Sequence, residues 1–175
     1  PDADVVIFAM EDDNPHSRQK RVNEYNYTKY GAARIAFRRK SVWLHGVFFN
    51  LCFGGGARYS AGEDTLFLHD CLQKGLRIYY VPYNIARFDE YRRSTWFKGY
   101  NEKFFFDKGL IYSLLFGKTA GIRLLISCLV HREYYDYSHS FLTVYHWCKN
   151  GKRARTKGYM TECETTTYYE KNTSS

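Results

Sequence analysis

The stretch GEDTLFLHDCLQKGLRIYYVP, residues 62–82, decides the fold class of this chain. Between residues 63 and 74, two acids stand in the first turn, a Lys-Gly pair closes the segment, and apolar residues recur at helical spacing: Phe67, Leu68, Cys71 and Leu72. Residues 76–81 then form a strand-like run that ends at Pro82. A helix followed at once by a strand is typical of the α/β class, and we expect that class here.

Further elements are predicted toward the N-terminus. Residues 5–10, VVIFAM, are a continuous apolar run, which is typical of a strand buried on both faces. Because nothing precedes this strand to supply its neighbours, the sequence predicts that the chain begins in the middle of a sheet. Residues 33–38 indicate another strand, and residues 39–45 indicate a short helix.

Beyond residue 108 the pattern becomes helical. Apolar residues at helical spacing, with basic residues between them, predict two amphipathic helices within residues 109–131 and a third that begins near Phe141. Lys118 and Arg123 interrupt the most apolar stretch, which argues against a helix that spans a membrane. Residues 159–175 are rich in Thr and Ser and predict a loose tail.

Composition limits the class of protein. With 175 residues, of which 45% are apolar and 19% aromatic, the chain can bury a core and is not a disordered protein. The formal net charge of +8 indicates an anionic partner, such as a nucleotide, a lipid phosphate, a membrane surface or a nucleic acid. Its five cysteines are scattered without a C-x-x-C pair, which predicts reduced thiols.

Two motifs resemble bacterial family 2 glycosyltransferases. The first consists of Phe53-Gly54-Gly55-Gly56 and residues 62–82. It is similar to the Glu-Asp motif of these enzymes and the strand that follows that motif. The second is STWFKGYN, residues 94–101, where the family places a Ser-Thr pair ahead of an aromatic-rich helix. Together the matches cover about residues 48–117.

This resemblance implies the domain organisation. Residues 1–108 would form the C-terminal, acceptor-side half of a Rossmann-like GT-A domain, residues 109–158 a helical extension, and residues 159–175 the tail. In the family, the Asp-x-Asp metal motif precedes the Glu-Asp pair by many more residues than Asp12 and Asp13 do here. Asp12 and Asp13 are therefore not assigned to a metal motif, and we expect them to form a turn. The donor-binding half would then lie outside this chain.

The resemblance also implies catalytic and acceptor-binding residues. A carboxylate in the first turn of a helix is stabilised as an anion and can accept a proton. Asp64 would be the general base of an inverting transfer, and Glu63 would orient the acceptor or the loop. The alternative is that both acids only complement the helix dipole. The implied acceptor-binding residues are Gly54, Gly55, Gly56, Thr65, Ser94 and Thr95, although Ser94 and Thr95 are also ordinary helix caps.

The implied reaction moves a sugar from a nucleotide-sugar donor to a saccharide or lipid-linked acceptor, in the synthesis of a cell-surface polysaccharide. Four cations near the second motif are candidates for contacts with the donor diphosphate: Arg87, Arg92, Arg93 and Lys98. A divalent metal, Mg²⁺ or Mn²⁺, is implied with its main ligands outside this chain. Some relatives place a metal-binding histidine just before the Ser-Thr pair, but residues 88–91 read FDEY here.

Two functions without catalysis stay open. Cations interleaved with aromatic residues can bind nucleic acid, although no RRM, KH or zinc-finger signature occurs. The basic amphipathic helices within residues 109–131, together with the cations of residues 149–157, could instead hold the chain at a membrane surface. That contact is compatible with catalysis, because transferases that resemble the chain often use lipid-linked acceptors at the inner face of the membrane. We expect a cytoplasmic protein, either soluble or peripheral at that face.

If the donor site lies elsewhere, this chain alone should bind a nucleotide sugar weakly and transfer no sugar. Titration calorimetry with uridine and guanosine diphosphate sugars measures the affinity. Micromolar binding would place the donor site within this chain and contradict the predicted division of labour.

Overall fold

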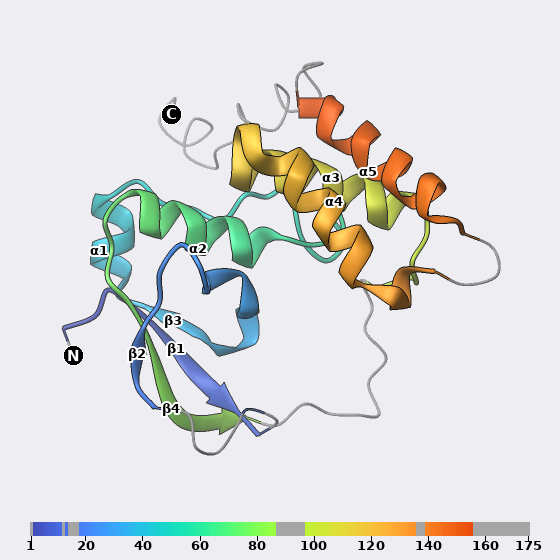
Figure 1. The fold of residues 1–175 in the computed structure, drawn as a ribbon. Coiled ribbons are helices and arrows are strands. Elements are labelled where there is room, and N and C mark those ends of the chain that lie inside the picture. The colour runs from blue at the N-terminus through green and yellow to red at the C-terminus, as the bar shows by residue number, and fades with distance from the viewer. Residues whose placement is uncertain (1, 12, 14–17, 87–96, 136–138, 156–175) are drawn as a thin grey trace, which may run out of the picture. The chain divides into compact units, whose positions relative to one another are not determined.

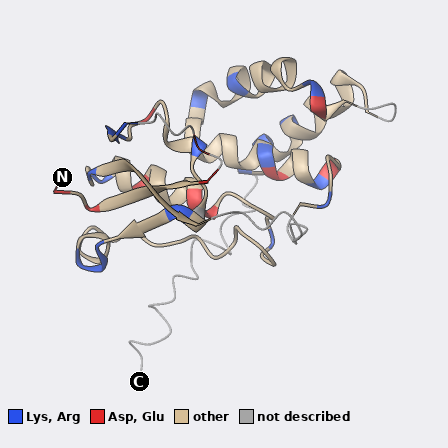
Figure 2. Ribbon diagram, turned by 90° about the horizontal axis from the view of Figure 1, so that it is seen from below, with Lys and Arg blue, Asp and Glu red and all other residues tan. Residues whose placement is uncertain are grey.

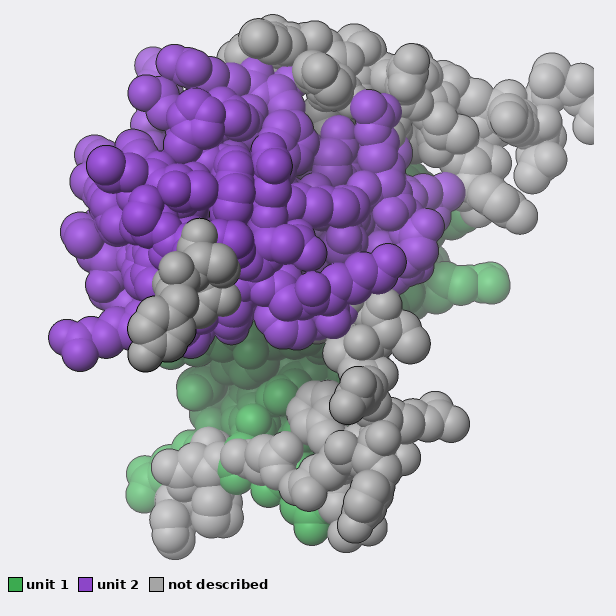
Figure 3. Space-filling view, turned by 90° about the vertical axis from the view of Figure 1, so that its right-hand side faces the viewer, with its two compact units in different colours: residues 1–50, 63–94 green, residues 51–62, 95–175 purple. Residues whose placement is uncertain are grey.

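The computed structural model describes residues 2–11, 13, 18–86, 97–135 and 139–155, and it has the α/β class that the sequence predicts (Figure 1; charged residues are coloured in Figure 2). Two compact units make up the chain, and Figure 3 colours them separately. Unit 1 consists of residues 1–50 and 63–94, and unit 2 of residues 51–62 and 95–175.

Unit 1 is built on a four-stranded mixed sheet with the order β2–β4–β1–β3. The two central strands, β1 (Val5–Met10) and β4 (Ile78–Ala86), are parallel. Each has an antiparallel neighbour, β3 (Ile35–Phe37) beside β1 and β2 (Lys20–Arg21) beside β4. Both neighbours of β1 therefore come from later in the chain, whereas the sequence predicts that they lie before it, and this expectation is wrong.

β4 continues past Pro82, where the sequence predicts its end. The pairing with β1 shifts at this point, because Phe8 lies opposite Val81 whereas Ala9 lies opposite Asn84. Such an irregularity accommodates a proline, which has no N–H group to donate to the neighbouring strand.

Unit 1 also contains the 3-10 turns η1 (Tyr27–Lys29) and η2 (Ala32–Arg34) and the helices α1 (Arg39–Leu44) and α2 (Glu63–Gln73). Both helices agree with the sequence. The buried residues of α2 are Leu66, Phe67, Leu68 and Cys71.

Asp4 ties together the starts of three elements of unit 1. Its carboxylate accepts hydrogen bonds from the Ser41 hydroxyl in α1 and from the backbone N–H of Arg77, just before β4, each 2.9 Å long. Asp4 itself directly precedes β1.

Unit 2 is helical, with α3 (Glu102–Phe116), η3 (Gly117–Thr119), α4 (Ala120–Val130), η4 (Arg132–Tyr134) and α5 (Phe141–Ala154). α3 begins before the predicted helical region, because the Asn101 side chain caps it by accepting a hydrogen bond from the Phe104 backbone N–H at 3.0 Å. The predicted domain division at residue 108 thus falls within α3, and the assignment of residues 1–108 to a glycosyltransferase domain stays a prediction. The predicted tail lies outside the described residues.

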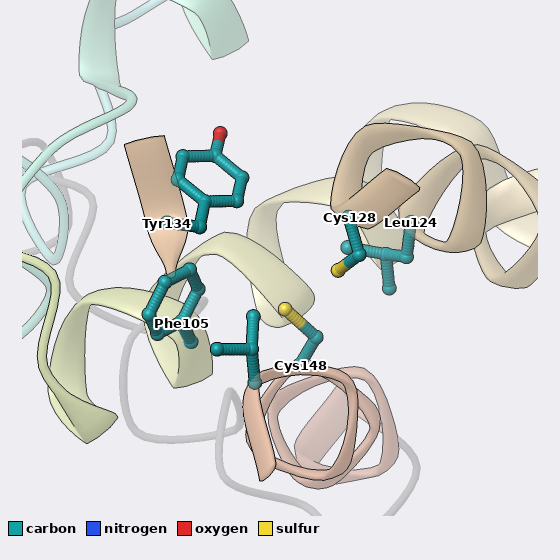
Figure 4. Packing of buried hydrophobic residues seen from close by; sticks show 6 residues of the cluster. Phe105, Leu124, Cys128, Tyr134 and Cys148 are labelled. Atoms are coloured by element: carbon teal, nitrogen blue, oxygen red, sulfur yellow. The ribbon is translucent and has the colours of Figure 1, made fainter. Parts of the chain in front are cut away.

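The core of unit 2 joins residues of all three helices: Phe105, Leu124, Cys128, Tyr134, Val144 and Cys148 (Figure 4). Phe105 lies near the start of α3 and Cys128 near the end of α4, yet both belong to this core. In one straight helix these two residues would be about 35 Å apart. α4 therefore folds back toward α3. The stretch Glu102–Val130 is long and apolar enough to cross a membrane by length and composition, but here it forms two helices that share one core.

α3 and α5 touch backbone to backbone at two glycines. A Cβ atom added to Gly109 would lie 1.9 Å from the carbonyl oxygen of Cys148, and one added to Gly151 would lie 1.8 Å from that of Phe106. Both distances are far below the 3.0 Å that real Cβ atoms respect. Phe106 precedes Gly109 in α3, whereas its partner Gly151 follows Cys148 in α5. The two helices therefore run antiparallel.

The predicted reduced state holds for only some of the cysteines. Cys71, Cys128 and Cys148 are free and buried, whereas Cys52 is disulfide-bonded, so the expectation is wrong for Cys52. Burial raises the pKa of Cys71 to about 12, which keeps this side chain a thiol at neutral pH.

We expect Gly109→Ala and Gly151→Ala each to destabilise the protein by about 2 kcal/mol or more, because the helices must move apart to admit the new methyl group. Gly121→Ala in α4 is the matched control, since its Cβ would meet only the end of the flexible Lys152 side chain, at 3.0 Å. Alanine favours a helix over glycine by about 1 kcal/mol, so the control should be neutral or stabilising. Urea unfolding measures all three, and equal stability of the Gly109 and Gly121 variants would contradict the backbone contact.

Candidate functional site

Asp64 stands in the first turn of α2 with its carboxylate oriented by the next residue. Its Oδ1 atom accepts a hydrogen bond from the Thr65 backbone N–H at 2.6 Å and another from the Thr65 hydroxyl at 3.3 Å. Both residues are half-buried, as is Glu63. Thr65, expected to bind the acceptor, thus contacts the candidate base itself.

The other oxygen of Asp64 lies beside Gly31. A Cβ atom added to Gly31 would be 3.4 Å from Oδ2 of Asp64, so a large side chain at position 31 would crowd the carboxylate. Gly31 is not predicted from the sequence, because no motif or spacing connects positions 31 and 64. Only the fold brings them together.

The direction of α2 follows from two contacts with the region around β3. Gly31, just before β3, lies beside Asp64, whereas Phe37, the last residue of β3, packs against Phe67 with 5.2 Å between ring centroids. Since β3 is antiparallel to β1, α2 runs from the carboxyl end of β1 toward its amino end. The first turn of α2, with Glu63 and Asp64, therefore lies toward the carboxyl edge of the parallel β1–β4 pair.

That edge is where open α/β sheets bind ligands, because the loops behind the carboxyl ends of parallel strands form a crevice there. A carboxylate in the first turn of a helix at this edge is placed to accept a proton from a bound hydroxyl group. The geometry is thus compatible with the role that the motif predicts for Asp64.

A second carboxylate at the same edge is already paired. Asp13, which follows β1, accepts hydrogen bonds from Nη1 of Arg34 at 2.8 and 3.0 Å and from the Tyr80 hydroxyl at 3.2 Å. Burial opposes its ionisation, but the bonds and charge of Arg34 outweigh that effect, and the pKa of Asp13 is below its usual value. The Asp13 backbone N–H also donates to the Met10 carbonyl at 2.9 Å, which confirms the turn predicted for Asp13.

Tyr30 fixes the segment that carries Gly31. Its ring is buried and stacks on the ring of Tyr80, 5.7 Å away between centroids. Burial also raises the pKa of the Tyr30 hydroxyl. Because Tyr80 is part of β4, this stacking holds position 31 against the sheet. Position 31 is thereby kept beside the Asp64 carboxylate.

The predicted glycine loop belongs to unit 2. Its backbone closes on itself through two hydrogen bonds of 2.9 Å, from Gly54 N–H to the Tyr59 carbonyl and from Tyr59 N–H to the Cys52 carbonyl. Gly54 and Gly56 have φ angles of +117° and +84°, a region that favours glycine, whereas Gly55 does not have a positive φ. Gly54 is buried, and Gly55 and Gly56 are exposed.

Asp107 anchors the end of this loop to α3. Its carboxylate, only 4% exposed as a residue, accepts hydrogen bonds from the Ser60 backbone N–H at 2.9 Å and from the Lys103 ammonium at 2.6 Å. The same ammonium donates to the Arg58 carbonyl at 2.9 Å. A buried carboxylate with a cationic partner makes a strong anchor, because loss of the Lys103 ammonium would leave the buried charge of Asp107 uncompensated.

Of the remaining predicted site residues, the described part of the chain contains Lys98. Lys98 is exposed, and its carbonyl accepts a hydrogen bond from the Asn101 side chain at 3.4 Å. Asp12 and five other predicted residues lie outside the described part of the chain: Arg87, Arg92, Arg93, Ser94 and Thr95.

The described residues offer no fitting site for the divalent metal that the resemblance implies. Among them, no group of three or more His, Cys, Asp or Glu side chains comes together, and Asp13 is bound to Arg34. The metal stays a prediction from the motifs.

Comparison with protein-family models, with curated proteins and with solved structures found no match to this chain. The likeness of residues 48–117 to family 2 glycosyltransferases stays a prediction from the motifs.

Gly55 and Gly56 form a matched pair for testing why the loop contains glycine. An added Cβ would meet nothing within 4 Å at either position, so the two differ in φ alone. We expect Gly56→Ala to cost about 1–2 kcal/mol of stability, because a left-handed backbone disfavours a side chain, and Gly55→Ala to cost almost nothing. Thermal unfolding distinguishes them, and equal melting temperatures would show that φ does not explain Gly56.

Proposed function

We propose that this chain is the acceptor-side part of an inverting glycosyltransferase and that Asp64 is its catalytic base. One observation carries the proposal: the first turn of α2 holds Asp64 at the carboxyl edge of the parallel β1–β4 pair, next to Gly31. The Glu-Asp motif that resembles family 2 enzymes supports it independently.

In the proposed reaction, a nucleotide sugar transfers its sugar to a hydroxyl group of a saccharide or a lipid-linked acceptor. The acceptor oxygen forms a bond to the anomeric carbon while the bond from that carbon to the diphosphate breaks. The nucleoside diphosphate leaves with the electron pair, and Asp64 takes the proton of the hydroxyl. A single displacement of this kind inverts the configuration of the anomeric carbon.

Thr65 supports this role by its two hydrogen bonds to Oδ1 of Asp64. We assign the Asp64 carboxylate, held in place by these bonds, as the proton acceptor. Glu63, the other acid of the first turn, is assigned to orient the acceptor. A contact of the exposed Gly55 and Gly56 with the acceptor sugar stays a prediction from the motif.

The alternative of a nucleic-acid-binding module rests on net charge and interleaved aromatic residues alone. Binding of single-stranded oligonucleotides that weakens steeply with salt would favour it over the enzyme.

In the complete enzyme, Asp64→Asn should lower turnover by about 10²–10⁴, because the amide preserves the shape of the side chain but cannot take the proton. The affinity for the donor should change little, since Asp64 is assigned to the acceptor. Glu63→Gln should lower turnover less than Asp64→Asn does. Asp70→Asn is the matched control on the same helix, where the exposed carboxylate contacts only the neighbouring His69 in the bonds described. Turnover of all three variants is measured with the same donor and the same acceptor. Near-normal turnover of Asp64→Asn would refute the assignment of Asp64 as the base.

A further inference from the structure

α4 has two apolar faces, only one of which is used by the core of unit 2. The residues that it buries are Ala120, Leu124, Ser127 and Cys128. On the opposite side, five aliphatic residues are 37% to 68% exposed: Ile122, Leu125, Ile126, Leu129 and Val130. These five recur at i, i+3, i+4, i+7 and i+8 and therefore form one continuous strip along the helix, called here the α4 stripe.

Single exposed aliphatic residues are normal on a protein surface, but a contiguous apolar strip indicates an interaction site. The α4 stripe consists of Ile, Leu and Val alone. Protein–protein interfaces are typically enriched in aromatic residues, Met and Arg and carry many hydrogen bonds, and the stripe offers none of these. Lipid tails require no hydrogen bonds, so its composition favours a bilayer.

Most of the charged residues near the stripe are cations. From residue 115 to residue 133 the chain contains one acid, Glu133, and three cations: Lys118, Arg123 and Arg132. All three are exposed. Lys118 precedes α4 and Arg132 follows it, so cations border the stripe at both ends, while the Arg123 guanidinium lies 4.4 Å from the centroid of the Phe116 ring. An apolar strip bordered by cations complements an anionic lipid surface.

We propose that the α4 stripe binds the surface of an anionic lipid membrane. α4 lies in the plane of the interface, with the stripe at the boundary of the acyl chains and Lys118 and Arg132 among the headgroups. An 11-residue helix is about 16 Å long, roughly half the thickness of the hydrocarbon layer, and its other face is held by the core. The helix therefore lies on the membrane and does not cross it. This inference does not depend on the proposed catalytic function.

The test uses the full chain and sedimentation with vesicles of phosphatidylcholine, with or without phosphatidylglycerol. Ile126→Ser together with Leu129→Ser should weaken binding to the anionic vesicles about tenfold or more, because two aliphatic side chains are lost from the lipid contact. Tyr25→Ser together with Leu44→Ser is the matched control, since these residues are 89% and 69% exposed and belong to unit 1, whereas the stripe belongs to unit 2. This control should bind like the wild type.

Lys118→Gln tests the electrostatic part without touching the stripe. It should weaken binding to anionic vesicles about fivefold at low salt, and it should leave binding to phosphatidylcholine unchanged. The proposal is overturned if the wild-type chain does not bind anionic vesicles, or if the Ile126 and Leu129 double variant binds them as well as the wild type. A third outcome would also overturn the proposal: the wild type is a dimer and binds no vesicles, and the double variant is a monomer. The stripe would then be an interface between two copies of the chain.

Discussion

The parallel pairing of β1 with β4 is the constraint on which the candidate site depends. Parallel strands cannot be joined by a hairpin, so the chain must cross over between them. The last element of this crossover is α2, which has to run back against the strands to deliver the chain to the start of β4. Its first turn is thereby placed at the carboxyl edge of the sheet. Asp64 owes its position to the topology, and Thr65 and Gly31 then set its surroundings.

The glycine loop has a different physical origin, although it directly precedes Glu63 in the sequence. Its shape comes from its own backbone hydrogen bonds and from the buried Asp107 carboxylate on α3. The two parts of the Glu-Asp motif therefore rely on separate cores, one built on a sheet and one on helices. Substitutions that loosen the core of unit 2 should disturb the loop while the hydrogen bonds between Thr65 and Asp64 persist.

The spacing of apolar residues was sufficient for α2 and for the helices of unit 2, and a continuous apolar run was sufficient for β1. The strand predicted over residues 33–38 is shorter in the structure, because Ala33 and Arg34 belong to η2 and β3 begins at Ile35. The spacing of apolar residues could not predict contacts between distant positions, such as the pairing of β1 with later strands or the approach of Gly31 to Asp64. Pro82 was misleading, since a bulge in the pairing allows β4 to continue through it. The disulfide of Cys52 was missed because cysteine spacing carries no information about distance in the fold.

The glycine contacts between α3 and α5 also affect how unit 2 can move. Most packed helices can slide past each other slightly, because flexible side chains between them change rotamer as they do so. At Gly109 and Gly151 no side chain separates the two backbones. A shift of one residue along the axis would bring a neighbouring side chain against the facing carbonyl group. Shear between α3 and α5 should therefore cost more than shear between helices that are separated by side chains.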